Sequence, residues 1–410
     1  MKLLIAIPAL NEAEAIDAII TRSLAARDAI IGGSAVDTVT ITVVSDGSTD
    51  ETVERARKYV PDIDLIVFPE NKGYGAAIKE AWDRSDADLL GFLDADGTCD
   101  PLFFTTLCTE LVESDADVAV GCRMNPDSQM PRTRRIGNTI FATMLTYMSA
   151  RGVRDVASGM RVVRRSVLDR LYPLPDGLHF TPAMSARVLL GGDLRMAEID
   201  MPYKERTGRS KLSVVKDGAR FLRIISLTAF LYRPGRILWS AAVLALAASA
   251  VMVADPLAYY IGHDALQDWM IYRCAAAALL LVTAALLFSG GYLATRVTDL
   301  AIFHRDSTGL QGRVRALVNS RAFLLVPAAA FVASIALGWG GFADYIDTGH
   351  VHTHWSRVLG IFTLLIVTVI LVVLKVLNVA IQLVRQRDID AAAAGLGGQV
   401  VAGELVEVRR

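Results

Sequence analysis

Three short segments place acidic side chains directly after apolar, strand-like stretches of this sequence. The segments are Pro8-Ala9-Leu10-Asn11-Glu12, Ser45-Asp46-Gly47-Ser48-Thr49-Asp50 and Leu93-Asp94-Ala95-Asp96-Gly97. Each one alone is also a common turn sequence, because Asp, Asn and Gly make local hydrogen bonds in turns. Ligands of open parallel sheets bind beyond the carboxyl ends of the strands. All three segments after strands of one sheet therefore favour a shared binding site.

Asp94 and Asp96 have the spacing of a site for a hard divalent cation. Two carboxylates one residue apart at a strand end can converge on a cation that bridges phosphate oxygens and neutralises a leaving diphosphate. The EF-hand alternative needs an acidic residue at the twelfth loop position, which is Thr105 here. The glycine-rich P-loop motif does not occur either. We therefore expect these two residues to bind Mg²⁺ or Mn²⁺ together with a diphosphate.

Two other turns carry glycine or polar residues. The turn at 71–75 opens a predicted helix, and contact with a nucleotide and a plain turn are both open interpretations. A later polar turn contains Asp155, Ser158, Gly159 and Arg161, for which support of the fold is the alternative to a binding role.

A second cluster of candidate residues is basic, and its members follow a strand or flank a helix. They are Arg123, Arg132, Arg134, Arg135, Arg206, Arg209, Ser210 and Lys211. Guanidinium groups match phosphate oxygens bidentately, and Lys adds a point charge. Attraction to anionic lipids, worth about 1 kcal/mol per basic residue, is the alternative for Arg132 and Arg135. The cluster predicts contact with phosphate groups.

The elements that must position these residues alternate between strand and helix. Strands are predicted at 3–8, 39–45, 63–68, 89–94 and 118–122, and helices at 13–26, 50–59, 74–84 and 101–112. Alternation at this spacing is typical of an α/β fold with an open, mainly parallel sheet.

Charge and hydropathy change near Arg233-Pro234-Gly235. Of the first 233 residues 61 are charged, against 24 of the remaining 177. Four apolar stretches have close to the length of about 20 residues that a helix needs to cross a bilayer. They lie at 237–254, 274–294, 323–339 and 358–381. Before them, residues 213–233 have the pattern of an amphipathic helix at the membrane interface, with a domain-packing helix as the alternative. We predict domains at 1–212, 213–233 and 234–385, the last an all-α domain of four transmembrane helices, with a tail at 386–410.

The arginine distribution predicts the orientation of these helices. The loop between the second and third stretches contains Arg296, Arg305, Arg313, Arg315 and Arg321, whereas the other two loops carry aspartates and almost no basic residues. The positive-inside rule places the basic loop, both termini and the N-terminal domain in the cytoplasm, at the cell (inner) membrane. Met1 leads directly into a strand, so we expect no signal peptide.

Composition excludes several other classes of protein. The net charge of -1 gives no basic field for nucleic acid. The cysteines, Cys99, Cys108, Cys122 and Cys274, form no C-x-x-C pair. A disulfide framework or zinc site is therefore not expected.

Taken in order, seven motifs resemble inverting glycosyltransferase family 2. They are P-A-L-N-E, S-D-G-S-T-D-E-T, N-K-G-Y-G, D-A-D, G-C-R, S-G-M-R and R-S-K-L. The likeness is greatest to the polyprenyl-phosphate (dolichol-phosphate type) mannosyl- and glucosyltransferases and covers about residues 1–235. It implies a GT-A-like sheet with a nucleotide-sugar site, a divalent metal, a donor of the GDP-mannose or UDP-glucose class and a polyprenyl phosphate acceptor.

The resemblance also implies roles for individual residues. Nucleotide contacts fall on Pro8, Ala9, Asn11, Glu12, Asp46, Lys72, Asp94 and Ala95. Asp94 and Asp96 take the metal and, with Arg123, are the catalytic residues. Acceptor or diphosphate contacts fall on Arg123, Arg134, Arg135, Arg206, Arg209, Ser210 and Lys211. Where the mannosyltransferases have D-A-D-L-Q, the position of the glutamine is Thr98 here.

The sequence shows no evident catalytic base after the basic cluster. A phosphate monoester has a second pKa of about 6 and is largely dianionic at pH 7, so a lipid phosphate acceptor needs positioning rather than deprotonation. We predict hexosyl transfer from a nucleotide sugar to a polyprenyl phosphate with inversion. Three alternatives stay open: a hydroxyl acceptor on a lipid or cell-envelope glycan with His179 or Glu205 as base, a processive synthase, and a non-catalytic membrane adaptor. The Q-x-x-R-W motif of processive synthases is absent. A homo-oligomer is also left open.

Overall fold

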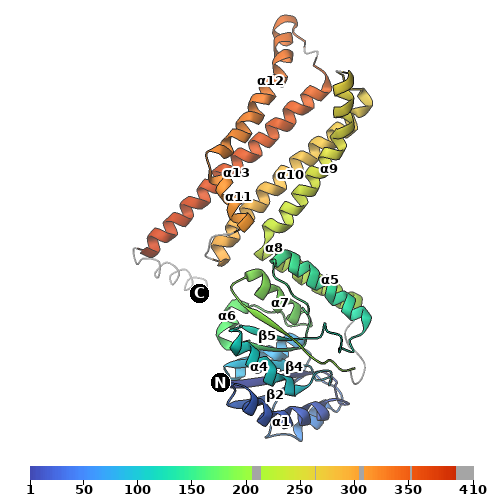
Figure 1. The fold of residues 1–410 in the computed structure, drawn as a ribbon, viewed down its shortest axis with the longest axis vertical. Helices are drawn as coiled ribbons and strands as arrows, with labels where there is room; N and C mark the ends of the chain where they lie inside the picture. The colour runs from blue at the N-terminus through green and yellow to red at the C-terminus, as the bar shows by residue number, and fades with distance from the viewer. Residues whose placement is uncertain (206–213, 264, 304–308, 351–352, 394–410) are drawn as a thin grey trace. The chain divides into compact units, whose positions relative to one another are not determined.

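The computed structural model describes residues 1–205, 214–263, 265–303, 309–350 and 353–393 (Figure 1). The chain divides into two compact units, Met1–Leu231 and Tyr232–Arg410. The first unit is built on a β-sheet covered by helices, and the described part of the second is helical.

A seven-stranded sheet in the order β3-β2-β1-β4-β6-β5-β7 forms the centre of the first unit. Its strands are β1 (Lys2–Ala9), β2 (Thr38–Asp46), β3 (Asp64–Phe68), β4 (Leu89–Leu93), β5 (Val118–Cys122), β6 (Met160–Arg164) and β7 (Met196–Asp200). β6 runs antiparallel to β4 and β5, and the other neighbours are parallel. This confirms the predicted open, mainly parallel sheet, and the five predicted strands lie within one residue of the observed ends.

Helices cover both faces of the sheet, which explains why β1 and β4 at its centre are apolar along almost their whole length. The helices of this unit are α1 (Ile16–Gly33), α2 (Thr52–Arg57), α3 (Tyr74–Arg84), α4 (Phe104–Glu113), α5 (Arg132–Ser149), α6 (Leu168–Leu171), α7 (Phe180–Gly191) and α8 (Val214–Tyr232), with 3₁₀ turns at Pro101–Phe103 and Arg165–Val167. One core cluster joins α1 and α4 to the sheet, and a second joins α3 and α7 to it. α1 extends beyond the predicted end at residue 26 because Ile30 is still buried in the core.

The sequence patterns do not predict β6 and β7. β6 contains two arginines, and Arg161 is completely buried there. Its guanidinium donates to the Ser158 carbonyl (3.0 Å), the Val156 carbonyl (2.8 Å) and the Ser185 hydroxyl (2.9 Å). These bonds compensate for burying the charge, so Arg161 supports the fold.

The strand register brings the three acid-rich turns together. Ala9 at the end of β1 pairs with Ser45 of β2, and Ala6 of β1 pairs with Phe92 of β4. Because these neighbours are parallel, the turns after β1, β2 and β4 all leave the sheet at the same edge.

α5 and α8 lie side by side, on the side of this unit away from α1 (Figure 1), and the ring centres of Phe141 and Phe221 are 5.9 Å apart. α8 occupies the position of the predicted amphipathic helix. It buries Phe221 and Ile225 and exposes Leu222, Leu227 and Phe230 about halfway. α5 exposes Ile136, Ile140 and Tyr147 by more than half. Both helices therefore present apolar side chains outward.

The second unit contains α9 (Pro234–His263), α10 (Ile271–Thr298), α11 (Gly309–Asn319), α12 (Leu325–Thr348) and α13 (Trp355–Ala393). Short 3₁₀ turns at Asp268–Met270 and Ala322–Leu324 and a π-helical turn at Asp299–Phe303 lie between them. Among the described residues, four segments are long and apolar enough to cross a membrane: Pro234–His263, Asp268–Ala301, Ala322–Thr348 and Trp355–Arg387. They contain the four predicted stretches and are longer at both ends.

A polar cluster connects α11 to the long helix α13. Lys375 Nζ donates to the carbonyls of Val318 (2.6 Å), Asn319 (2.9 Å) and Ser320 (3.2 Å). The first two are the last residues of α11, and Ser320 follows directly after it. The buried Asn378 accepts from the Tyr292 hydroxyl and donates to Asn319 Oδ1, both at 2.7 Å. Lys375 thus satisfies carbonyls that a helix end leaves without intrahelical partners.

Candidate active site

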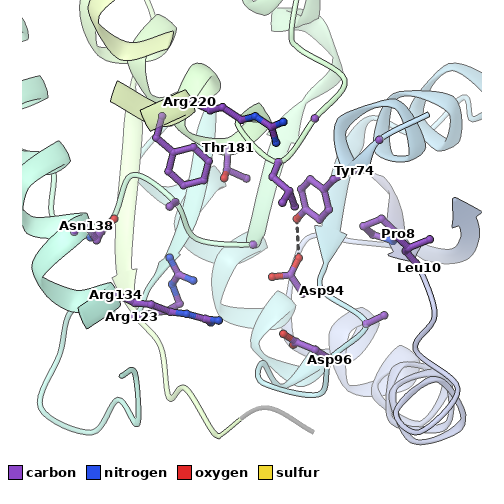
Figure 2. A pocket seen from close by; sticks show the side chains of 18 of the residues that line it. Pro8, Leu10, Tyr74, Asp94, Asp96, Arg123, Arg134, Asn138, Thr181 and Arg220 are labelled. Atoms are coloured by element: carbon purple, nitrogen blue, oxygen red, sulfur yellow. Dashed lines mark hydrogen bonds between the residues drawn. The ribbon is translucent and has the colours of Figure 1, made fainter. Parts of the chain in front are cut away.

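A cavity of about 490 Å³ lies at the sheet edge where the acid-rich turns meet. Turns after β1, β2, β4 and β5 form one part of its wall, and the start of α3, the turn before β6, and helices α5, α7 and α8 form other parts. The predicted residues that line it are Pro8, Ala9, Glu12, Asp46, Asp94, Ala95, Asp96, Arg123 and Arg134. Figure 2 shows the two aspartates between Pro8 on one side and Arg123 on the other.

Each aspartate of the D-A-D motif is oriented by a hydroxyl group. The Tyr74 hydroxyl donates to Asp94 Oδ1 at 2.7 Å, and the Thr98 hydroxyl donates to Asp96 Oδ1 at 2.6 Å. Burial, together with the adjacent Asp94 carboxylate, raises the pKa of Tyr74 well above its usual value, so the phenol remains a donor. Thr98 is almost completely buried and does not line the cavity, so its hydroxyl serves Asp96.

Asp94 and Asp96 supply two carboxylates, and a cation site here needs further ligands. Among the described residues, no group of three or more His, Cys, Asp or Glu side chains is arranged to hold a metal. Mg²⁺ typically binds through one or two carboxylates plus water and substrate phosphates. The two carboxylates fit that kind of site, in which a diphosphate completes the coordination.

The turns after β1 and β2 are tied to each other and to the start of α3. Asn11 Oδ1 accepts from the Thr49 backbone N–H at 2.7 Å, and the Asn11 N–H donates to the Ser48 hydroxyl at 3.0 Å. Asp46 accepts from the backbone N–H groups of Lys72 and Gly73 at 2.7–3.1 Å. Asn11 is therefore a brace between two turns and does not itself line the cavity.

Lys72 also lies outside the cavity wall. Its ammonium group stands 4.5 Å from the centre of the Phe68 ring, in a cation–π contact. The structure thus gathers Pro8, Ala9, Glu12 and Asp46 at the predicted nucleotide end, without the side chains of Asn11 and Lys72.

Arg123 is clamped by a buried carboxylate. Its Nε and Nη2 donate to Asp155 at 2.7 and 2.8 Å, and its backbone N–H donates to the same side chain at 3.0 Å. Burial alone would raise the pKa of Asp155, but the Arg123 charge and hydrogen bonds outweigh burial and hold that pKa below its usual value. The Arg123 guanidinium is also 5.5 Å from the centre of the Tyr203 ring. Arg123 therefore reaches the cavity in a fixed orientation.

The other predicted basic residues divide into three groups. Arg134 lines the cavity next to Arg123 (Figure 2). Arg135 donates to the Asn125 carbonyl at 2.7 Å, and neither Arg135 nor the exposed Arg132 lines the cavity. Arg206, Arg209, Ser210 and Lys211 lie outside the described residues.

Several lining residues are missing from the sequence-based prediction. They are Tyr74, Met130, Asn138, Phe141, Thr181, Tyr203, Arg220 and Phe221. Tyr74 lies within the N-K-G-Y-G motif, which is a usable signal. Arg220 and Phe221 belong to the amphipathic helix α8. Its sequence pattern predicts a polar and an apolar face, but it does not predict that residues of this helix line the cavity.

The alternative with a side-chain base receives little support from the cavity wall. In the part of the chain that the structure describes, the lining contains no histidine. His179 neighbours the lining residue Leu178, and burial followed by the nearby Arg220 charge lowers its pKa. Glu205 also lies outside the lining, where its backbone N–H donates to the Gln129 side chain.

Comparison with known proteins finds relatives for the first unit. The family described as glycosyl transferase family 2 matches residues 4–172. The low-salt glycan biosynthesis hexosyltransferase Agl6 of Haloferax volcanii is 32% identical over 46% of this chain, a match that spans only 45% of Agl6 itself. The dolichyl-phosphate hexose transferase of the same organism is 32% identical, over 43% of this chain and 75% of that protein. The dodecaprenyl-phosphate galacturonate synthase of Rhizobium johnstonii is 25% identical, over 64% and 77%.

Solved structures also resemble this chain. One is glucosyl-3-phosphoglycerate synthase from Mycobacterium tuberculosis, in complex with Mn²⁺, UDP and phosphoglyceric acid. It is 18% identical, with a TM-score of 0.46 over 56% of this chain and 78% of that one.

Proposed function

Since this chain belongs to glycosyltransferase family 2, we propose that it transfers a hexosyl group from a nucleotide sugar to a polyprenyl phosphate, with inversion. The observation that carries the proposal is the division of one cavity into an acidic end and a basic, partly apolar end. Two of the relatives are named for dolichyl-phosphate and dodecaprenyl-phosphate, which are lipid phosphates of this class.

The acidic end fits the donor. Pro8, Glu12 and Asp46 line the space expected for the nucleoside, and Asp94 with Asp96 would hold Mg²⁺ or Mn²⁺ beside it. Such a cation neutralises the charge that develops on a departing diphosphate. Because Tyr74 and Thr98 already orient the two carboxylates, little reorganisation is needed when the donor binds.

The opposite end fits a lipid phosphate. Arg123 and Arg134 offer guanidinium groups, and Met130, Phe141 and Phe221 add apolar surface to the cavity wall. The Asp155 clamp fixes the Arg123 side chain before any ligand arrives, so the entropic cost of ordering it is already met. A phosphate bound there would stand next to the sugar-bearing diphosphate in the same cavity.

A phosphate nucleophile also agrees with the chemistry of the cavity wall. The acceptor phosphate, largely dianionic at pH 7, has an oxygen ready to attack the anomeric carbon without a proton-accepting side chain. An attack from the face opposite the departing diphosphate inverts the anomeric configuration.

An acceptor panel tests this function. The purified full-length protein with Mg²⁺ or Mn²⁺ is incubated with UDP- and GDP-sugars and with polyprenyl phosphate, free polyprenol or diacylglycerol. We expect transfer to polyprenyl phosphate alone, because the other two lack the anionic nucleophile. Comparable transfer to polyprenol would contradict the mechanism, and donor binding without transfer to any lipid phosphate would support a non-catalytic adaptor.

We also propose that the protein is a multi-pass protein of the cell membrane, with its first unit and both termini in the cytoplasm. The support is the set of four apolar helices and the arginines between α10 and α12. Cysteines are introduced singly at Thr348 and Ala316, both exposed, in a Cys274→Ala background. An impermeant thiol reagent added to intact cells should label the first and not the second, and the reverse pattern would refute this orientation.

A further inference from the structure

The N-K-G-Y-G turn at 71–75 contributes lining residues to the cavity. Its fourth residue, Tyr74, reaches the cavity and makes the hydrogen bond to Asp94 Oδ1 drawn as a dashed line in Figure 2. The donor and acceptor lie twenty residues apart in the chain. The structure therefore gives this turn a direct connection to the D-A-D motif.

The two glycines beside Tyr74 allow another segment to pack against the turn. A Cβ atom at Gly73 would lie 2.4 Å from the Asp176 carbonyl oxygen, and one at Gly75 would lie 2.2 Å from the Pro175 carbonyl oxygen. The Asp176 carbonyl accepts from the N–H groups of Gly75 and Ala76 at 2.6 and 3.1 Å. Since Asp46 accepts from Gly73, these first N–H groups of α3 are used within the protein. The turn is thus built to fix the backbone of Tyr74 rather than to bind an anion.

The Tyr74 ring is fixed as well. It makes edge-on contacts with Phe92 and Phe180, with ring centres 6.5 and 6.4 Å apart. Phe92 belongs to β4, the strand that leads directly to Asp94. The phenol and the carboxylate are therefore held against the same strand, which fixes the distance between them.

The opposite side of the Asp94 carboxylate meets Gly159. A Cβ atom at that position would lie 2.0 Å from Asp94 Oδ2, so only glycine leaves room for the carboxylate in this orientation. The Asp94 carboxylate is thus held by the Tyr74 hydroxyl at Oδ1, and its Oδ2 lies against the backbone of Gly159.

We propose that Tyr74 is a positioning residue that sets the orientation of Asp94 for its divalent cation, as Thr98 does for Asp96. This inference rests on the proposed function, since it assumes that the D-A-D motif holds a metal. Partners that orient metal ligands typically contribute about 10- to 100-fold to metal affinity. Removing the hydroxyl while keeping the ring should reduce cation affinity by that order.

The test compares Mn²⁺ binding by Tyr74→Phe and wild-type full-length protein. Mn²⁺ is titrated in the presence of UDP or GDP, and free Mn²⁺ is measured by electron paramagnetic resonance. Tyr172→Phe is the matched control, because the buried Tyr172 hydroxyl has no hydrogen-bond partner in the described part of the chain and does not line the cavity. We expect the dissociation constant to rise about 10- to 100-fold in Tyr74→Phe and to stay unchanged in Tyr172→Phe.

Thermal unfolding without metal separates positioning from general stabilisation. Tyr74→Phe keeps both ring contacts, so its Tm without metal should stay close to that of wild type, while its stabilisation by Mn²⁺ with diphosphate should shrink. Unchanged Mn²⁺ affinity, with or without a lower Tm, overturns the role of Tyr74 and leaves the proposed function intact. Failure of wild type itself to bind Mn²⁺ with either diphosphate overturns the metal site and this inference together.

Discussion

The two ends of the cavity hold their charged side chains with different kinds of partner. At the acidic end, the hydroxyls of Tyr74 and Thr98, which are neutral, donate to Asp94 and Asp96. At the basic end, the partner of Arg123 is Asp155, a carboxylate. A neutral donor orients a carboxylate without offsetting its charge. An ion pair orients a guanidinium, but the two opposite charges largely offset each other, so the electric field of the pair is weak at longer distances.

This difference indicates how each end selects a ligand. The acidic end brings the carboxylates of Asp94 and Asp96 to one wall of the cavity, where they would attract a divalent cation. The Arg123–Asp155 pair is close to neutral as a unit, so a phosphate would be recognised there by short hydrogen bonds and by further basic groups such as Arg134 and Arg220. We expect charge changes at the acidic end to cost most, and changes at the basic end to act through geometry.

Asp96→Asn should have the largest effect, because it removes a full charge from the cation site while keeping the shape of the side chain. Loss of one electrostatic contact in an active site typically reduces kcat about 10²- to 10³-fold. Transfer is measured with saturating donor and Mn²⁺, and Asp86→Asn, at an exposed acid far from the cavity, is the control. Full activity of Asp96→Asn, or activity that survives excess chelator, would remove the metal from the mechanism.

Replacing Arg123 should have the second-largest effect on transfer. A double variant is needed to separate loss of function from loss of stability. Arg123→Ala leaves Asp155 buried without its counter-charge, which should lower the free energy of unfolding by about 3–5 kcal/mol. In Arg123→Gln/Asp155→Asn both charges are gone, so most of that stability should return.

Transfer by the paired variant then reports on function alone. Losing a charge-assisted contact costs about 1.5–3 kcal/mol, or roughly 10- to 150-fold in rate. We expect that loss in the transfer assay even where thermal unfolding shows a stable protein. Normal transfer would mean that Arg123 only supports the fold.

Arg220→Ala should have a smaller effect, since this side chain is half exposed and reaches the cavity from α8. One partly solvated contact is worth about 1–1.5 kcal/mol, which corresponds to roughly 5- to 12-fold. The change should raise KM for polyprenyl phosphate and leave KM for the donor unaltered. Arg223→Ala, one turn further along α8 and outside the lining, is the control, and an equal effect of both would point to general lipid attraction.

The smallest effect concerns the outward face of α5, behind the basic end. If its exposed apolar residues contact lipid, a cysteine introduced at Ile140 should react more slowly with a thiol reagent when the protein is in lipid nanodiscs than when it is in a mild detergent. Val67, exposed on β3, gives the comparison position. Equal reactivity of both cysteines in nanodiscs would show that α5 faces water and that the lipid reaches Arg123 by another route.

The acidic end could be predicted from the sequence because Pro8, Asp46 and Asp94 lie at or directly after the ends of strands that the sequence marks clearly. Parallel neighbours end at one edge, so Pro8, Asp46 and Asp94 had to meet. The basic end depends on pairs that no local pattern marks, such as Arg123 with Asp155, thirty-two residues away. β6 was missed because a buried arginine interrupts its apolar pattern, and its partners come from α7 and the preceding turn.

The helix faces were the other part that sequence patterns left open. Periodicity identifies α8 as amphipathic, but only the packing of Phe221 against Phe141 shows that its buried face borders the cavity. Tyr74 belongs to a motif that is visible in the sequence, yet its partner is determined by the tight contacts of Gly73 and Gly75 with residues 175–176.

The contacts of Lys375 have a consequence for how the last helix enters the bilayer during synthesis. A lysine costs about 2.5–3.5 kcal/mol of insertion free energy at the centre of a transmembrane segment, whereas the Lys375 ammonium contacts residues just before the apolar segment that begins at Ala322. The carbonyls that receive the Lys375 ammonium belong to residues 318–320, which leave the ribosome well before α13 does. If α13 crosses the membrane as proposed, the acceptor for this charge is already made when the helix is inserted, and chain order would lower the cost of placing the lysine.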